Sequence, residues 1–205
     1  KVDNAGFDKE MEKSKKLARA NWKGSGDKSL EEKWFKVREQ LSPTEFLGYE
    51  FDKLEGVILK ICKGKDFVNE AKNGEEVEIV TNQTPFYAES GGQVGDTGRF
   101  YGNGVSVDVR DTVKDGETIV HKVEVTDGTV NVGDILTAEV DADVRNATRR
   151  NHSATHLLHA ALREVLGDHV NQRGSLVETE RLRFDFSHFD AVTPDELRQI
   201  DIFPR

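Results

Sequence analysis

The sequence predicts an α+β fold in three parts: a helical connector at residues 1–48, a small β-barrel at residues 49–142, and an α/β domain at residues 143–205. Three observations predict this division. Helix-forming residues dominate the first part, residues that alternate in polarity dominate the second, and a long helical pattern followed by strands opens the third. A chain of 205 residues can form one sizeable domain or two small ones with hydrophobic cores.

The first part is rich in Lys, Glu and Ala, and its apolar positions are sparse. One helix is predicted at residues 7–22, and a glycine-rich break follows it. A second helix is predicted from Ser29 to Leu41, with Ser29 as N-cap and Glu32 in the capping-box position. Neither helix has enough apolar face to form a core alone, so this part is interpreted as a connector or an appendage to a neighbouring domain.

The second part contains segments that alternate apolar and polar residues as β-strands do, at residues 57–61, 77–80, 105–109 and 119–125. Turns rich in Gly, Asn and Asp separate the segments, and these residue types tolerate positive φ. About six short strands at this spacing fit a closed or half-closed barrel. The single cysteine, Cys62, lies in the first strand and is interpreted as a small buried hydrophobe.

The third part begins with a predicted helix at residues 142–166, followed by predicted strands at residues 170–177 and 181–187. A further helix is predicted to begin at Pro194 with Thr193 as its N-cap. The sequence ends soon afterwards, so we expect this domain to be truncated at its C-terminus.

Composition favours a highly charged globular chain, with 33% charged residues and a mean hydropathy of -0.62. No apolar run approaches the roughly 20 residues of a membrane span, and the first residues show no export signal. We therefore expect a cytoplasmic protein with no membrane partner. The single cysteine excludes an internal disulfide and a cysteine-cluster metal site.

The formal charge of -9 is unevenly distributed. Residues 144–183 contain seven arginines and four acidic residues, a local charge of +3 that leaves -12 for the rest. This basic region fits a phosphate-facing surface, and it equally fits a solvated face with local ion pairs. Charge alone leaves both interpretations open.

Two histidines, His152 and His156, lie four residues apart on the predicted helix. This spacing places both imidazoles on one face, one turn apart, where both can reach one metal ion. At 100° per residue, His159 and Arg163 fall within about 40° of His152. The apolar residues of the helix fall on the other side, so the histidines are predicted to lie opposite the core-facing stripe.

The histidine pair leaves two interpretations open, a metal site or a solvent-facing polar stripe. Ser153 stands where a zinc protease needs a glutamate as general base, which argues against peptidase chemistry. Two imidazoles also leave a tetrahedral zinc two ligands short.

A glycine-rich run at residues 84–98 is the second unusual stretch. Its glycines permit positive φ and close backbone approach. The run lacks the Lys-Ser/Thr ending and the following helix of a phosphate-binding loop. On spacing alone, a tight barrel turn is the favoured interpretation.

Three stretches together carry a family resemblance: residues 84–98, residues 151–163, and residues 172–177 with 183–188. They closely resemble alanyl-tRNA synthetases of bacteria, in the same order and spacing, and the likeness extends over residues 1 to about 200. The matching part of that family is the editing region. Free-standing AlaX deacylases carry a similar module, and the threonyl-tRNA synthetase editing domain is less closely similar.

The resemblance implies that residues 143–205 are part of an editing (deacylase) domain, which acts in protein biosynthesis. Such a domain hydrolyses mischarged Ser-tRNA(Ala) and Gly-tRNA(Ala), because a pocket for alanine rejects serine and glycine poorly. The implied partners are tRNA(Ala), mischarged aminoacyl-tRNA and the remainder of the synthetase. Aminoacylation, with ATP and magnesium, would belong to a ligase domain that this sequence does not contain.

The resemblance also implies a zinc site, in which His152 and His156 bind the metal together with a later Cys-x-x-x-His. This sequence has no such motif, because Asp66 stands four residues after Cys62. Thr155 and Gln172 match family positions that line the editing pocket and affect discrimination or hydrolysis. The expected zinc site is therefore incomplete in this sequence.

Five further residues complete the expected site. Gly91 and Gly92 match the glycine motif that packs beside the editing core, and the arginines Arg150, Arg163 and Arg173 are expected to face the tRNA. The alternatives are a non-catalytic tRNA-binding or structural remnant with an incomplete zinc site, and an unrelated metal-dependent hydrolase.

Overall fold

The computed structural model describes Trp34 and residues 41–202. Both helices predicted before residue 41 therefore lie outside the described residues, except for Trp34 and Leu41. The indole of Trp34 is fully buried and packs with Cys62, Val80 and Val120. Its Nε1 donates a hydrogen bond of 3.2 Å to Glu78. The predicted connector thus contributes a buried aromatic side chain to the outside of the barrel.

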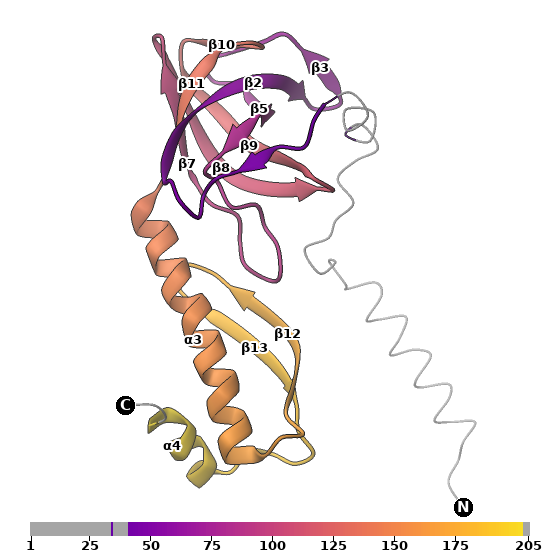
Figure 1. Ribbon diagram of the computed structural model, residues 1–205, viewed down its shortest axis with the longest axis vertical. Helices are drawn as coiled ribbons and strands as arrows, with labels where there is room; N and C mark the ends of the chain where they lie inside the picture. The colour runs from indigo at the N-terminus through magenta and orange to yellow at the C-terminus, as the bar shows by residue number, and fades with distance from the viewer. Residues whose placement is uncertain (1–33, 35–40, 203–205) are drawn as a thin grey trace, which may run out of the picture.

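Six strands close into the predicted barrel (Figure 1). Their order is β11-β7-β8-β9-β5-β2, and antiparallel pairing of β11 with β2 closes the ring. The six are β2 (Lys53–Lys63), β5 (Glu76–Thr81), β7 (Gly98–Gly102), β8 (Val105–Asp115), β9 (Thr118–Asp127) and β11 (Ile135–Val140). The short strands are β1 (Glu45–Phe46), β3 (Asp66–Val68), β4 (Glu70–Lys72), β6 (Gln83–Thr84) and β10 (Thr129–Asn131).

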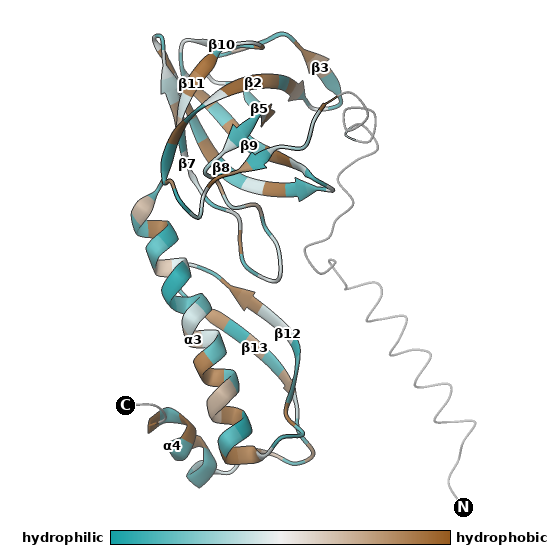
Figure 2. Cartoon of the chain, viewed as in Figure 1, coloured by the Kyte–Doolittle hydropathy of each residue, from teal (hydrophilic) through white to brown (hydrophobic). Residues whose placement is uncertain are grey.

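The barrel encloses the main hydrophobic core, which is built from the inward positions of the alternating strands. Figure 2 shows apolar and polar residues alternating along these strands. Phe86 and Phe100 fill the interior with ring centroids 5.4 Å apart, and Ile58 and Leu136 are buried beside them. Cys62 is fully buried beside Trp34, outside this interior, which confirms its interpretation as a small buried hydrophobe.

The ionisable side chain of His121 packs against Phe86 and Phe100 in the barrel interior. His121 is fully buried, its Nδ1 lies 3.1 Å from the carbonyl oxygen of Ile79, and its Nε2 lies 2.9 Å from the hydroxyl of Thr84. The ring is neutral when Nδ1 donates to the carbonyl and the hydroxyl donates to Nε2. Burial lowers the pKa of His121 from 6.5 to about 4, although the Ile79 carbonyl acts in the opposite direction.

The lowered pKa of His121 predicts acid sensitivity. Between pH 6.5 and about 4 the unfolded ring binds a proton that the folded ring does not, so the free energy of unfolding falls as pH falls. The expected loss across this window is about 3 kcal/mol. A His121→Gln variant should be less stable at pH 7 and should show a shallower pH dependence in urea unfolding. An unchanged pH slope would contradict the prediction.

The α/β domain follows the barrel directly and contains the four predicted elements. They are α3 (Ala142–Leu166), β12 (Asn171–Val177), β13 (Leu182–Ser187) and α4 (Pro194–Ile202). The strands β12 and β13 form an antiparallel pair beside α3 (Figure 1). Among the described residues, no helix is both long and apolar enough to cross a membrane. The predicted α+β fold class is confirmed.

Capping residues define the ends of the two helices. Asp141 accepts hydrogen bonds from the first turn of α3, and Gly167 ends that helix. Thr193 and Glu196 form a reciprocal capping box at α4, in which the Glu196 amide donates to Thr193 Oγ1 at 3.3 Å. Thr193 is the N-cap that the sequence predicts, and Asp141 is a short polar side chain of the same kind.

The buried face of α3 differs from the prediction. Ala161 and Leu162 are buried as expected, but Leu157 is 52% exposed, and Thr155 is buried. The core-facing side therefore lies next to the histidines and not opposite them. The reason is that α3 meets the neighbouring strands partly through polar contacts, since Asn151 Nδ2 donates to the Glu178 carbonyl at 2.7 Å. A hydropathy pattern does not reveal such contacts.

Candidate functional site

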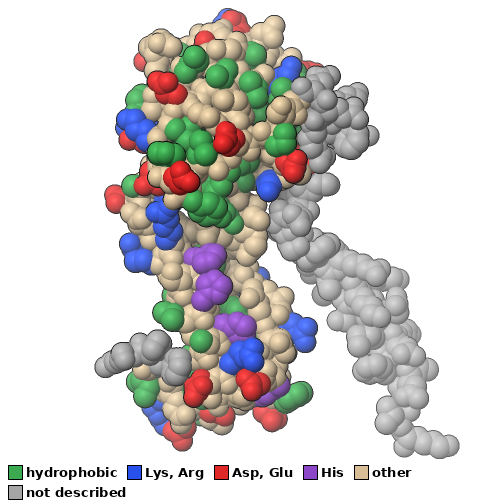
Figure 3. All heavy atoms as spheres, in the orientation of Figure 1, with side chains coloured by type: hydrophobic (Ala, Val, Ile, Leu, Met, Phe, Trp, Pro, Cys, Tyr) green, Lys and Arg blue, Asp and Glu red, His purple; other side chains and the backbone are tan. Residues whose placement is uncertain are grey.

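The two predicted metal-binding histidines lie together on α3. Their Nε2 atoms are 3.2 Å apart, and both rings belong to exposed residues. Two nitrogen ligands at about 2.0–2.1 Å from a tetrahedral zinc would lie about 3.3 Å from each other. The Nε2 atoms of His152 and His156 therefore fit two ligand positions of one zinc ion. Figure 3 shows histidine side chains in a row on the visible face of this domain.

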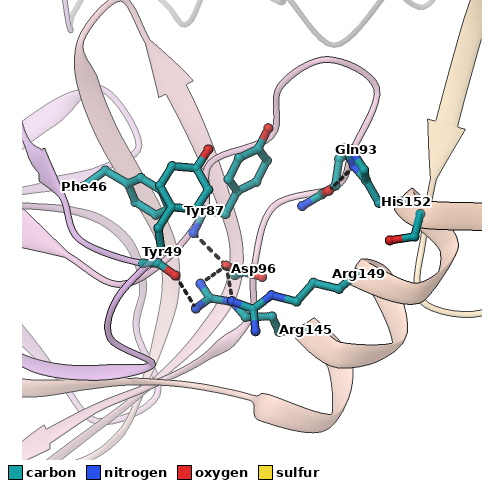
Figure 4. Close-up of a pocket in the computed structure, with 10 residues that line it drawn as sticks. Phe46, Tyr49, Tyr87, Gln93, Asp96, Arg145, Arg149 and His152 are labelled. Atoms are coloured by element: carbon teal, nitrogen blue, oxygen red, sulfur yellow. Dashed lines mark hydrogen bonds and ion pairs between the residues drawn. The ribbon is translucent and has the colours of Figure 1, made fainter. Parts of the chain in front are cut away.

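Gln93 orients the first of these rings. Its Oε1 lies 2.8 Å from Nδ1 of His152, as the dashed line in Figure 4 shows. The amide oxygen can only accept, so Nδ1 carries the proton and Nε2 presents its lone pair. Metal-binding histidines are commonly held by such a contact at their other ring nitrogen. In the sequence, only its place in the glycine-rich run distinguishes Gln93.

The glycine-rich run brings Gln93 to the histidines because it packs on β12. Val177 donates its amide to the Gly92 carbonyl at 2.8 Å, and Val94 donates to the Val177 carbonyl at 3.1 Å. Gly92 has a φ of +83°, and a Cβ at this position would lie 2.4 Å from the Ser175 carbonyl oxygen. Only glycine fits this close approach. The loop therefore joins the barrel to the α/β domain.

The two predicted pocket residues differ in their surroundings. Thr155 is 7% exposed, and its hydroxyl donates to the Asn151 carbonyl at 2.8 Å within α3. Gln172 is exposed, and its amide nitrogen lies 3.2 Å from the Ser175 hydroxyl, which in turn lies 3.5 Å from the Gly91 carbonyl oxygen. Gln172 thus belongs to the contact between loop and strand, whereas Thr155 is turned toward the buried side of the helix.

The described residues supply only part of a zinc site. Within residues 41–202 and Trp34, no group of three or more His, Cys, Asp or Glu side chains is placed to hold a metal ion. The chemistry and spacing of His152 and His156 fit zinc, and the further ligands that zinc needs are not among these residues.

A cavity of 420 Å³ lies between the barrel and α3, beside the histidine pair (Figure 4). Aromatic residues from the barrel and polar residues from the helix line it: Phe46, Gly48, Tyr49, Tyr87, Gln93, Asp96, Arg145, Arg149, His152 and Ser153. The aromatic wall of this cavity was not predicted from the sequence.

Arg145 holds α3 against the barrel at the base of this cavity. Its side chain is 5% exposed and pairs with the equally buried carboxylate of Asp96, to which Nε donates at 3.1 Å. Nη1 donates to Asp52 at 2.8 Å and to the Gly48 carbonyl at 3.2 Å, and Nη2 donates to the Pro85 carbonyl. In the sequence, Arg145 is one of the seven arginines of the basic region. No pattern in the sequence indicates that the Arg145 side chain is buried or that it joins the helix to the barrel.

The three arginines expected to face tRNA lie in different places. Arg150 is exposed and lines a second, shallow hollow beside the cavity. Arg163 pairs with Asp168 at 2.9 Å, and it lies about 16 Å along the helix axis from His152. Arg173 is exposed at the irregularity in β12. Of the three, only Arg150 lies next to the cavity.

Comparisons with known proteins agree with the resemblance in the sequence. A family model described as tRNA synthetases class II (A) matches residues 1–144. An alanine–tRNA ligase of Chelativorans sp. (strain BNC1) is 51% identical over 201 residues, and one of Nitrobacter winogradskyi is 54% identical over 201 residues. Each alignment covers 98% of this chain and 23% of the relative. The chain therefore spans less than a quarter of the length of these relatives.

Proposed function

The chain belongs to the class II tRNA synthetase (A) family, and from this premise we propose that it is part of an alanine–tRNA ligase, in which it serves the editing of mischarged tRNA. One observation carries the editing proposal: the Nε2 atoms of His152 and His156 lie 3.2 Å apart beside a 420 Å³ cavity. The pair lies on the helix that borders this cavity.

The proposed reaction is hydrolysis of the ester that joins serine or glycine to tRNA(Ala). Water adds to the ester carbonyl, the bond to the ribose oxygen breaks, and the ribose regains its hydroxyl proton. Gln172 is exposed and is proposed to contact the substrate hydroxyl or to orient the water. The Thr155 hydroxyl is hydrogen-bonded within the helix, so this residue is proposed to shape the pocket and not to contact the substrate through its hydroxyl.

Zinc is the proposed cofactor, with His152 and His156 as two of its ligands, and when bound it would position and polarise the ester carbonyl. Gln93 would keep the His152 ring in the tautomer that presents Nε2. ATP and magnesium are proposed to act only at a separate ligase site, and the protein is proposed to work in the cytoplasm.

A deacylation assay tests the proposal directly. The purified chain with added zinc is expected to release serine from Ser-tRNA(Ala) and glycine from Gly-tRNA(Ala) faster than the uncatalysed rate, and to leave Ala-tRNA(Ala) largely intact. Metal analysis of the same preparation measures the zinc that is bound.

The absence of a third ligand among the described residues favours a second candidate function, a non-catalytic tRNA-binding remnant. Binding of tRNA(Ala) without hydrolysis of Ser-tRNA(Ala) would support this candidate. A chain that neither binds tRNA nor hydrolyses the ester would refute both.

Gln93→Ala is expected to lower the affinity for zinc about 10–100-fold, since the His152 ring would lose its orienting acceptor. Gln93→Glu keeps an acceptor oxygen and should restore most of the affinity. Gln83→Ala is the matched control, because Gln83 is a glutamine whose amide donates to Glu55 on the barrel. A zinc titration monitored through the NMR chemical shifts of the His152 ring nitrogens measures the zinc affinity and the tautomer of the ring in one experiment. Equal affinities for all four proteins would contradict the role of Gln93.

A further inference from the structure

We propose that Asn103 is a site of spontaneous covalent modification, at which the side chain loses ammonia and the residue becomes aspartate or isoaspartate. Asn103 lies in the turn between β7 and β8. The strand β7 begins beside Asp141, the N-cap of α3, so this turn lies at the end of the barrel away from α3 (Figure 1). No residue of the turn belongs to the proposed editing site, so the modification does not depend on the proposed function.

The sequence contains two asparagines that are followed directly by glycine, at Asn73–Gly74 and at Asn103–Gly104. In such a pair the backbone nitrogen of the glycine can attack the side-chain amide carbon of the asparagine, because glycine has no side chain that obstructs the approach. The glycine nitrogen gives up its proton, the side-chain nitrogen leaves with that proton as ammonia, and a succinimide ring forms. Water then opens the ring at one of its two carbonyl groups, which gives aspartate or isoaspartate.

The Asn103–Gly104 pair is open to this attack. Both residues are exposed, and they are the two central residues of a hairpin turn that Gly102 and Val105 close. Among the described residues, the Asn103 side chain has no hydrogen-bond partner, and the Gly104 amide nitrogen has no acceptor. A Cβ at Gly104 would meet no described atom within 4 Å. The attacking nitrogen is therefore free, and solvent can reach it to remove its proton.

The Asn73–Gly74 pair is also exposed, but hydrogen bonds hold its backbone. The Gly74 amide donates to the Val125 carbonyl at 2.7 Å, and the Asn73 amide donates to the Gly128 carbonyl at 3.0 Å. The nitrogen that would attack in this pair must first leave its hydrogen bond, which slows the reaction about fivefold for a bond of ordinary strength. The two pairs are therefore a matched comparison within one chain, and Asn103 is the reactive member.

The conformation of the turn decides what each product does to the barrel. Asn103 has a φ of +53° and Gly104 has a φ of +76°, the pattern of a type I′ turn, which fixes the register of the strands that it joins. Aspartate can keep this geometry. Isoaspartate cannot, because the main chain then runs through the former side chain and the turn gains one carbon atom.

The turn has little room to lengthen, because it packs against a neighbouring turn. A Cβ at Gly128 would lie 2.5 Å from the Gly104 carbonyl oxygen. The Gly128 carbonyl in turn accepts the hydrogen bond from Asn73, so three turns meet at this end of the barrel. Isoaspartate at Asn103 is therefore expected to weaken the pairing of β7 with β8 and to displace the turn at Gly128.

Incubation of the purified chain at mildly alkaline pH tests the proposal, because loss of the proton from the attacking nitrogen is then favoured. Peptide mass spectrometry measures the mass gain at each asparagine, and a methyltransferase specific for isoaspartate identifies that product. Asn103 is expected to react about fivefold faster than Asn73. In concentrated urea the two rates should become similar, since the hydrogen bond of the Gly74 amide is then lost.

Hydrogen exchange of the modified protein measures the effect on the barrel. The matched control is Asn103→Asp, which carries the charge of isoaspartate without the additional carbon atom in the main chain. Amide exchange in β7, β8 and residues 127–131 is expected to be about fivefold faster in the isoaspartate form than in the control, as for the loss of one hydrogen bond. Exchange in α3 should be the same in both proteins. Thermal unfolding of Asn103→Asp checks that the control is folded.

Several outcomes would overturn the proposal. In the folded chain, equal rates at the two asparagines or a faster reaction at Asn73 would show that the free Gly104 amide does not select the site. An Asn103 that stays unmodified while the urea sample reacts would show that the turn protects it. Equal hydrogen exchange in the isoaspartate form and in Asn103→Asp would show that the turn accommodates the additional atom.

Discussion

Arg145→Ala is expected to lower the free energy of unfolding by about 3–5 kcal/mol, the largest loss of stability that we predict for a single substitution. Asp96 is buried, and without Arg145 its carboxylate would lose its charged partner. The carbonyl groups of Gly48 and Pro85 would lose the same donor. The first turns of α3 should then separate from the barrel.

Urea unfolding and amide hydrogen exchange across α3 measure this effect. Arg149→Ala is the matched control on the next turn, and its half-exposed side chain should contribute little to stability. A double variant, Arg145→Met with Asp96→Asn, should be more stable than Arg145→Ala because no unpaired charge remains buried. If Arg145→Ala unfolds like the control, the buried pair does not stabilise the contact between barrel and helix.

His152→Ala and His156→Ala are each expected to lower the affinity for zinc at least 100-fold and to reduce hydrolysis of Ser-tRNA(Ala) to the uncatalysed rate. Each substitution removes one of the two nitrogen atoms that lie 3.2 Å apart, and a single imidazole cannot chelate the metal. The loss should exceed that of Gln93→Ala, which removes only an orienting contact. Zinc titration and the deacylation assay measure both effects.

His188→Ala serves as the control for these histidine variants. His169 and His188 form a second imidazole pair, with nitrogen atoms 2.8 Å apart, away from the cavity. Zinc binding that is lost in His188→Ala and retained in His152→Ala would move the metal site to the second pair. Hydrolysis that persists in both variants of the first pair would exclude that pair from the reaction.

Most of the fold could be predicted because its signals are local. The alternating segments from residue 57 to residue 125 all lie in barrel strands, and the helix predicted at residues 142–166 has the same bounds in the structure. The N-cap Thr193 was also predicted correctly. These features depend on the polarity period and on capping chemistry, which neighbouring residues determine.

The candidate site was predicted less completely. The pair of His152 and His156 follows from helical spacing alone, but Gln93 reaches it from another element. The direction of the buried helix face was predicted incorrectly, because Thr155 is buried and Leu157 is not. Long-range polar contacts decide both points, and a single sequence does not reveal them.

The sequence by itself determined the order of barrel, helix and strands. It also determined the position of two histidines one helical turn apart and the resemblance to the synthetase family. Each of these features depends on residues that lie close together in the chain. The tertiary structure alone decided which distant residues share one cavity. It brought the aromatic residues of the barrel, the loop residue Gln93 and the helical residues Arg149 and His152 to the same place. The physical reason is that the Arg145–Asp96 pair and the close approach of Gly92 to Ser175 fix how the two domains pack, and these contacts join residues 49 and 83 positions apart.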